Sequence, residues 1–361
     1  MDKDLQARLA PLRERIDELD EQILGLLNER ARAALGVGQA KLDFDAEGPI
    51  LKPEREALVV RRLQDLNGGP FPAEAVEAVW EQVISACRGL ESVLTAAYLG
   101  PQGSFSEQAV FEHFGHAVNG LQCESFDEVF RAVEAGQADV GMVPVENSTE
   151  GAVNRSLDLL LSSPLRVLGE RTIRIRHNLL TRSGTLEGVH QVLGHPQALA
   201  QCQSWLSRNH PELERLPVAS NAEAARQAGA NPALAAIAGE AAAHAWGLEA
   251  VSSGIQDDPQ NQTRFLAIGA MDTLSSGRDK TSVILAVPNR AGAVYEMLAP
   301  LAANGVSMTR FESRPARTGQ WEYYFYVDVL GHHQDESVAR ALSELQQQVA
   351  FFKLLGSYPR Q

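Results

Sequence analysis

The chain has 361 residues and a mass of 39.2 kDa, enough for two or three domains with hydrophobic cores of their own. Its net charge of −14 and pI near 5.2 argue against general binding of nucleic acids or anionic membranes, which needs a positive surface. The three cysteines are separated and form no CxxC pair, the first residues are charged, and no apolar run is long enough to span a membrane. We therefore expect a cytoplasmic protein without a metal or cofactor, in which small anions bind where cations are gathered locally.

A long first helix is predicted by apolar residues that recur from Leu5 onwards with the 4,3,4,3 spacing of a coiled-coil seam. Arg30 falls on that seam, where a lone cation is unfavourable unless an anion pairs with it; the alternative is a polar residue that sets the helix register. Lys41 follows three turns later, at about 16 Å, so both side chains can reach one small ligand. Arg13 lies about 25 Å before Arg30, too far to share a site within one chain. The helix therefore predicts a dimer in which an antiparallel partner contributes Arg13.

Two further helices are expected near residues 53–66 and 73–90, and residues 1–95 resemble the all-helical chorismate mutases. The matching runs are LRERID at 12–17, ER at 29–30, Lys41, ERE at 54–56 and SACRGLE at 85–91. The resemblance implies a pericyclic rearrangement that needs no nucleophile, catalysed by preorganisation and by cations placed where negative charge develops. It implies that the substrate carboxylates are held by Arg13 of the partner subunit, Arg30 and Arg55, the ether oxygen by Lys41 and Glu91, and the ring hydroxyl by Glu56, with Cys87 in the binding pocket.

This sequence departs from that pattern at two positions. Glu91 stands where some relatives have Gln, and a carboxyl group donates a hydrogen bond only when it is protonated. The mutase reaction is therefore expected to favour acidic pH. Lys52 stands where relatives can carry an acid, and it is left out of the predicted site.

From residue 96 onwards, short apolar strands alternate with helices, and the chain leaves for a second lobe at about 176–260 before it returns. This order predicts a two-lobed α/β fold that closes about a hinge, like the periplasmic binding proteins. Polar residues follow the ends of several strands, where open α/β sheets bind their ligands. Ser148 and Thr149 are alternatively ordinary helix caps.

Residues 96–272 resemble the prephenate dehydratases through four motifs in order. These are GPQGSFS at 100–106, VPVENS at 143–148, GHPQ at 194–197 with QC at 201–202, and TRF at 263–265. The implied reaction removes water and carbon dioxide from prephenate to give phenylpyruvate. On this resemblance Thr263 bonds the departing hydroxyl, Asn147 and Gln201 position the substrate, and Arg264 clamps an anion. Ser104, Glu146, Ser148 and His195 complete the expected binding site, with Glu146 and His195 as alternative proton sources.

After a linker at 273–280, the predicted β-α-β-β-α-β order is ferredoxin-like. Residues 281–361 resemble ACT regulatory domains, through NRAGAVY at 289–295 and ESRP at 312–315. The resemblance implies feedback binding of phenylalanine between two such domains of a dimer. Ala291 stands where relatives often have Pro, which bears on affinity, and the alternative is a dimerisation domain that has lost its ligand. The expected effector-binding residues are Gly292, Ala293, Val294, Glu312, Ser313 and Arg314.

Together these segments predict a bifunctional enzyme that converts chorismate to phenylpyruvate under control by phenylalanine. Two alternatives remain open at this point. One is a non-catalytic sensor of small anions, because two lobes and an effector domain also suit ligand-gated signalling. The other is a dehydratase whose helical segment serves only dimerisation.

Overall fold

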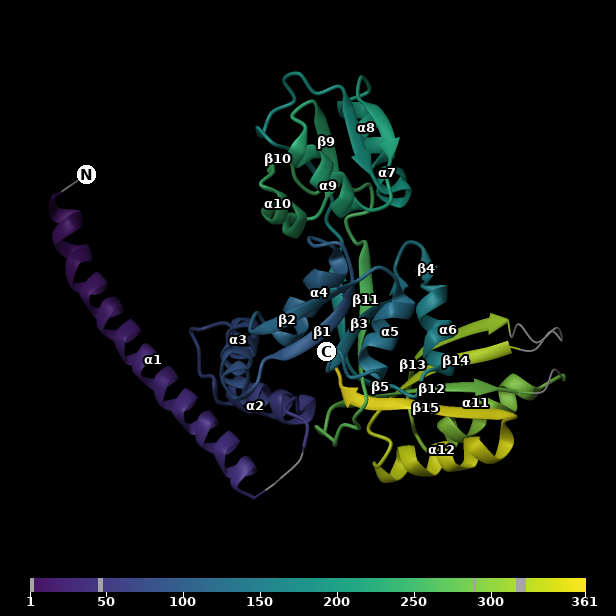
Figure 1. Ribbon diagram of the computed structural model, residues 1–361. Coiled ribbons are helices and arrows are strands. Elements are labelled where there is room, and N and C mark those ends of the chain that lie inside the picture. The colour runs from purple at the N-terminus through teal and green to yellow at the C-terminus, as the bar shows by residue number, and fades with distance from the viewer. Residues whose placement is uncertain (1–2, 45–47, 288–289, 316–322) are drawn as a thin grey trace.

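The computed structural model describes residues 3–44, 48–287, 290–315 and 323–361, so Asn289 of the expected effector motif lies outside the described residues. The chain forms a helical unit, a two-lobed α/β unit and a C-terminal α+β unit (Figure 1). The predicted multidomain fold is therefore confirmed. In the described part of the chain, no helix has both the length and the apolar character needed to cross a bilayer.

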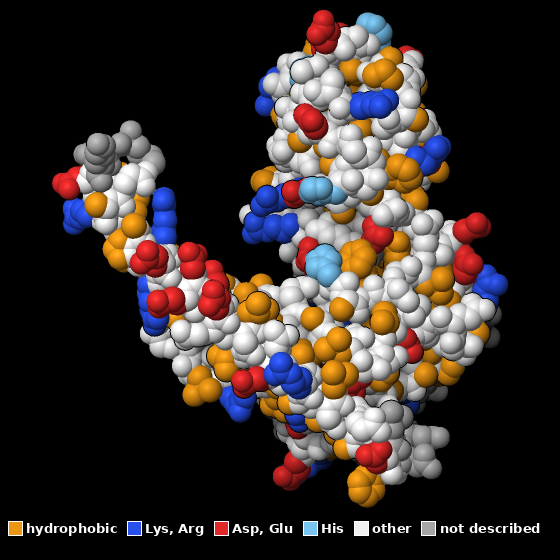
Figure 2. Space-filling view, turned by 60° about the vertical axis from the view of Figure 1, so that its left-hand side comes forward, with side chains coloured by type: hydrophobic (Ala, Val, Ile, Leu, Met, Phe, Trp, Pro, Cys, Tyr) orange, Lys and Arg blue, Asp and Glu red, His pale blue; other side chains and the backbone are white. Residues whose placement is uncertain are grey.

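The helical unit is dominated by one long helix that stands away from the rest of the chain (Figure 1). Its helices are α1 (Lys3–Asp43), α2 (Pro53–Leu66) and α3 (Ala73–Glu91). The apolar seam of α1 is largely uncovered: Leu12, Ile23 and Leu26 are 62%, 54% and 65% exposed. Figure 2 shows the projecting helix with hydrophobic side chains on its surface. A long amphipathic helix is normally stabilised by burial of such a seam, and these residues do not bury it within one chain.

The first lobe of the α/β unit is built on a sheet in the order β2-β1-β3-β11-β5, with β4 on β3. Its strands are β1 (Leu94–Leu99), β2 (Val118–Cys123), β3 (Val140–Asn147), β4 (Gly151–Ala152), β5 (Arg166–Arg174) and β11 (Gln262–Gly269). Its helices are α4 (Phe105–Phe114), α5 (Phe126–Glu134) and α6 (Asn154–Ser162). Strand β11 returns from the second lobe and runs antiparallel between β3 and β5, so the centre of this sheet is formed by segments far apart in sequence.

The second lobe is a smaller sheet in the order β10-β6-β9-β7-β8. Its strands are β6 (Asn178–Thr181), β7 (Gln191–Gly194), β8 (Glu214–Pro217), β9 (Leu234–Ala238) and β10 (Glu249–Ser252). Its helices are α7 (Pro196–Gln201), α8 (Gln203–Asn209), α9 (Asn221–Ala230) and α10 (Glu240–Trp246). The chain passes between the lobes twice, from β5 to β6 and from β10 to β11, as the predicted hinge requires.

The C-terminal unit is an antiparallel sheet in the order β13-β14-β12-β15 with two helices. In chain order the elements are β12 (Asp279–Ala286), α11 (Ala293–Ala303), β13 (Met308–Pro315), β14 (Tyr323–Leu330), α12 (Glu336–Gln348) and β15 (Phe351–Pro359). Apolar side chains from one sheet face pack with α11 and α12. This is the predicted β-α-β-β-α-β order.

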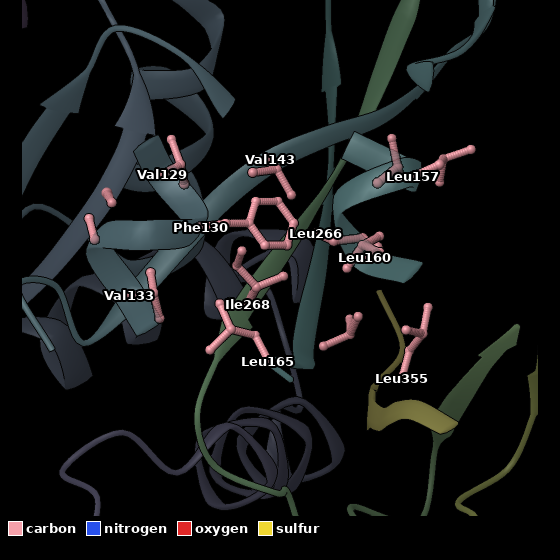
Figure 3. Close-up of a cluster of buried hydrophobic side chains, with 14 of the residues drawn as sticks. Val129, Phe130, Val133, Val143, Leu157, Leu160, Leu165, Leu266, Ile268 and Leu355 are labelled. Carbon is pink, nitrogen blue, oxygen red and sulfur yellow. The ribbon is translucent and has the colours of Figure 1, made fainter. Parts of the chain in front are cut away.

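The opposite face of that sheet shares a core with the first lobe. Phe130 of α5, Leu157 and Leu160 of α6 and Leu266 of β11 form one buried cluster with Leu355 of β15 (Figure 3). A shared core resists separation, because parting the two units would expose these side chains to water. The C-terminal unit is therefore packed directly on the lobe that carries β3 and β11.

Candidate active sites

The helical site forms where α1 meets α3. The Lys41 Nζ atom lies 3.2 Å from Glu91 Oε2, so two predicted residues are in contact. Gly38 makes this approach possible, because a Cβ atom there would lie only 3.1 Å from Glu91 Cγ. Burial raises the pKa of the Glu56 carboxyl, and Arg30 lies close enough for its charge to oppose that rise. Lys41 of α1 therefore lies against a carboxylate of α3, and Arg30 of α1 lies near a carboxylate of α2.

Arg88 is a member of this site to which sequence reasoning gave no role. Its Nη1 atom donates to Glu56 Oε1 at 2.5 Å and its Nη2 atom to the Phe114 carbonyl at 2.6 Å, and the residue is buried. Burial raises the pKa of Glu56, while the Arg88 guanidinium opposes that rise. The sequence spacing could have indicated a role for Arg88, because it lies one helical turn before Glu91 and shares its helix face.

Among the remaining predicted residues of the helical site, Arg13 is too far along the helix to join the others within one chain. Arg13 and Arg55 are exposed, and Arg13 lies on the projecting part of α1. Cys87 is buried on α3. The distance along the helix keeps Arg13 about 25 Å from Arg30, so any shared role requires a second copy of the chain.

The α/β unit carries a second polar cluster, which crosses the hinge between its lobes. Asn147 Nδ2 donates to Thr263 Oγ1 at 2.8 Å and to Asn261 Oδ1 at 2.9 Å. Asn261 Nδ2 in turn donates to Gln201 Oε1 at 3.0 Å, and His177 Nε2 lies 3.0 Å from the same oxygen. The three predicted residues Asn147, Gln201 and Thr263 therefore belong to one hydrogen-bonded chain.

The local structure holds this cluster in place. Asn147 Oδ1 accepts the backbone N–H groups of Thr149 and Glu150, both at 3.0 Å, which fixes the amide orientation. Thr263 stands directly opposite Asn147 in the β3–β11 pairing. Since the Thr263 oxygen accepts from Asn147, the hydrogen of its own hydroxyl is directed elsewhere.

Asn261 and His177 are cluster residues without a predicted role. Asn261 lies within the polar run before β11, but nothing in the sequence distinguishes it from its neighbours there. His177 is buried, and burial lowers its pKa, so the neutral imidazole is favoured. Its ring meets Phe105 edge to face at 5.8 Å. Only the folded hinge brings both residues to Gln201.

Three predicted binding residues have local structural contacts. Ser104 caps α4 by accepting from the Glu107 N–H group at 3.2 Å, and His195 Nδ1 accepts from Gln197 N at 3.3 Å at the start of α7. The Ser148 hydroxyl accepts from Gln262 N at 3.0 Å.

Glu146 and Arg264 differ from expectation, because neither lies with Asn147 and Thr263. Successive residues of a strand point to opposite faces, so each stands on the reverse side from its neighbour. Glu146 accepts from Arg310 of β13 at 2.8 Å, and Arg264 donates to Asp328 of β14 at 2.6 Å. Both side chains therefore contact the C-terminal unit.

The expected effector residues lie at the start of α11 and on β13. Gly292 has φ of 84°, a left-handed conformation that favours glycine, and precedes the buried Ala293 and the partly exposed Val294. On β13, Ser313 is exposed, whereas Glu312 is half-buried. Arg314 donates to Asn154 at 2.5 Å and lies 2.8 Å from Asp158, both on α6. The turn at Gly292 is thus built as expected, while Arg314 contacts the first lobe.

Comparison with known proteins agrees with this division of the chain. Family models match residues 12–92 (Chorismate mutase type II), 96–273 (Prephenate dehydratase) and 281–347 (ACT domain). A relative from Neisseria gonorrhoeae, named bifunctional chorismate mutase/prephenate dehydratase, is 48% identical over 99% of each chain. The structure of a prephenate dehydratase from Arthrobacter aurescens in complex with L-Phe covers 74% of this chain and 90% of its own, with a TM-score of 0.68 and 34% identity. A structure described as GqqA, a quorum-quenching acylase, covers 74% of this chain and 98% of its own, with a TM-score of 0.67 and 30% identity.

Proposed function

Because the chain belongs to the bifunctional chorismate mutase/prephenate dehydratases, we propose that its two polar clusters divide the work of two successive reactions. The enzyme rearranges chorismate to prephenate and then dehydrates and decarboxylates prephenate to phenylpyruvate, in phenylalanine biosynthesis. The first reaction is assigned to the helical unit and the second to the cluster at the hinge.

In the mutase site, cations bind the two carboxylates and hold the substrate in its reactive conformer. Arg30, Arg55 and Arg13 of the partner subunit bind the carboxylates, while Lys41 and Glu91 contact the ether oxygen on which negative charge develops. The 3.2 Å contact between Lys41 and Glu91 supports this, because both polar heads already converge on one point. Such preorganised charges stabilise the transition state without rearranging during the reaction.

We also propose that the enzyme is a dimer with shared mutase sites, supported by the uncovered seam of α1 and by the exposed position of Arg13. The test co-expresses R13A and R30A chains, each inactive as a mutase when alone. A mixed dimer has one site with both arginines intact, so random pairing restores about a quarter of wild-type mutase activity. No recovery in verified mixed dimers would contradict shared sites, and dehydratase activity in the same sample checks folding.

In the dehydratase site, Thr263 assists departure of the ring hydroxyl. The carbon–carbon bond to the lost carboxylate breaks, its electrons enter the ring, and the carbon–oxygen bond breaks to complete the aromatic product. Asn147 donates to the Thr263 oxygen, so the Thr263 hydrogen is available to the departing oxygen. Asn261 and Gln201 extend the hydrogen-bonded chain to the second lobe, so closure about the hinge adjusts the site.

The observation that carries this proposal is the unbroken chain of hydrogen bonds from Thr263 to Gln201. The test follows phenylpyruvate absorbance with chorismate or prephenate as substrate. T263V removes the hydroxyl while keeping the shape, and dehydratase kcat is expected to fall by at least about 100-fold. T263S, which keeps the hydroxyl, is the matched control and should retain most activity. Equal activity of the two variants would reject the assigned role of Thr263, and unchanged mutase rates check that both chains are folded.

The C-terminal unit is assigned the binding of phenylalanine as a feedback inhibitor. The left-handed turn at Gly292 presents backbone N–H groups to a ligand carboxylate, and the related A. aurescens protein was solved with L-Phe. Calorimetric titration with phenylalanine tests this, with G292V as the variant expected to lose binding. We place the enzyme in the cytoplasm, which its three buried, unpaired cysteines support.

A further inference from the structure

The two strands that carry the dehydratase residues have charged residues on their reverse face. In the β3–β11 pairing, Thr263 stands opposite Asn147, and Arg264 stands opposite Glu146. Strand geometry sends the first pair to the active site and the second pair to the other side of the sheet. Each charged residue is therefore one peptide bond from a residue of the active site.

The C-terminal unit presents a complementary pair at the same place. Arg310 of β13 and Asp328 of β14 are cross-strand neighbours. Arg310 Nε donates to Glu146 Oε2 at 2.8 Å, and Arg264 Nη1 donates to Asp328 Oδ2 at 2.6 Å. These four residues form a closed arrangement, with two neighbours on the catalytic sheet and two on the effector sheet, and we name it the four-charge square.

The surroundings hold the square tightly. Arg264 Nε also donates to Glu170 at 2.8 Å and Nη2 to the Tyr358 hydroxyl at 3.0 Å, while the Ser282 hydroxyl donates to Asp328 at 2.6 Å. The side chains of Arg264 and Asp328 are only 14% and 6% exposed. A buried ion pair with several hydrogen bonds has one favourable geometry, so movement of β14 must either move β11 or leave a buried charge unpaired.

We propose that Glu146 and Arg264 are positioning residues, through which the effector domain sets the geometry of Asn147 and Thr263 and so delivers phenylalanine inhibition to the dehydratase reaction. The inference rests on the proposed roles of Asn147 and Thr263. Glu146 and Arg264 are joined to Asn147 and Thr263 within β3 and β11 themselves, with no loop between them. A small shift of β13 and β14 is therefore transmitted directly to Asn147 and Thr263. A shift of 1 Å is enough to matter for a site that depends on orientation.

The test uses the Glu146–Arg310 side of the square, because Glu146 is 41% exposed and its variants are expected to fold. E146Q and R310Q should lower dehydratase kcat, and should raise the phenylalanine concentration that gives half inhibition by at least about fivefold. Phenylalanine binding, measured by calorimetry, should stay within about twofold of wild type. In the double variant E146Q/R310Q the loss of inhibition should not exceed that of either single variant, because both residues act through one contact.

K353M is the matched control within the same interface. Lys353 Nζ donates to the carbonyls of Leu160, Leu161 and Ser163, so these hydrogen bonds join β15 to α6 and the residue that follows it, not to β3 or β11. K353M should lower thermal stability but keep wild-type inhibition, and mutase activity in every variant reports on the rest of the fold.

Two results would overturn the inference. One is a phenylalanine concentration for half inhibition within twofold of the wild-type value in both E146Q and R310Q. The other is an equal loss of inhibition in K353M, because the four-charge square would then have no effect beyond that of any contact in this interface. Failure of the proposed function is distinguishable, because T263V would then retain dehydratase activity. If T263V is inactive while the square variants respond normally, only the coupling inference fails.

Discussion

Replacing Arg264 with Met separates an interface role for this residue from a substrate-binding role. The change leaves Glu170 with Lys280, whose Nζ lies 2.7 Å away, whereas Asp328 keeps, among the described side chains, the Ser282 hydroxyl as its hydrogen-bond partner. Breaking a buried ion pair on one side destabilises a protein by about 3–5 kcal/mol. Because both carboxylates keep one partner, we expect about 3 kcal/mol for R264M, a fall in Tm of about 6–12 °C for a unit of this size.

Differential scanning calorimetry of the full-length enzyme measures this change, with prephenate kinetics on the same preparations. R264M/D328N should recover most of the lost stability, since the uncompensated charge is then removed. R155M, which breaks the exposed pair between Arg155 and Asp127, should leave Tm unchanged. A normal Tm for R264M with a raised KM for prephenate would refute the reasoning and restore the substrate clamp expected from sequence.

Three further predictions concern single positions. Burial lowers the pKa of His113 to about 3, below its value in the unfolded chain. As the pH falls below about 6.5, the unfolded state therefore binds a proton before the folded state does, and the free energy of unfolding should fall by up to about 1.4 kcal/mol per pH unit. In H113F, the Tm values measured at pH 5 and pH 7 should differ less than in the wild type. E91Q keeps a hydrogen-bond donor at every pH, so its mutase rate should vary less between pH 5 and 8 than wild type, and an unchanged profile would discard protonation of Glu91. In G38V the added Cβ would lie 3.1 Å from Glu91 Cγ and the larger side chain would force Glu91 aside, so mutase kcat should fall while dehydratase kcat stays unchanged; equal losses in both would indicate misfolding instead.

The sequence could predict the elements and the motif residues because their signals are local. The seam of the first helix, the alternation of strands with helices and the final β-α-β-β-α-β order all depend on neighbours in the chain. Asn147, Gln201 and Thr263 stand at or near the ends of strands and helices, and the predicted two-lobed fold brings these ends to one cleft. The structure indeed joins them through Asn261.

What the sequence could not give depends on contacts between distant segments. His177 is an isolated histidine until the hinge brings it to Gln201, and Arg88 has no visible partner until α2 packs beside α3. The positions of Glu146 and Arg264 could have been anticipated in part. Each is adjacent in a strand to an expected catalytic residue, so the two neighbours cannot face the same cleft. Their partners on β13 and β14 still required the folded interface.

The uncovered seam of α1 also bears on how this enzyme is made. Within one chain, the described residues leave Leu12, Ile23 and Leu26 of this seam mostly exposed, so folding of a single chain does not cover it. In the proposed dimer the seam is buried by a second chain, so assembly of the mutase sites is a second-order reaction whose rate depends on the concentration of chains. At low expression, the dehydratase half would then mature ahead of the mutase half of the same polypeptide.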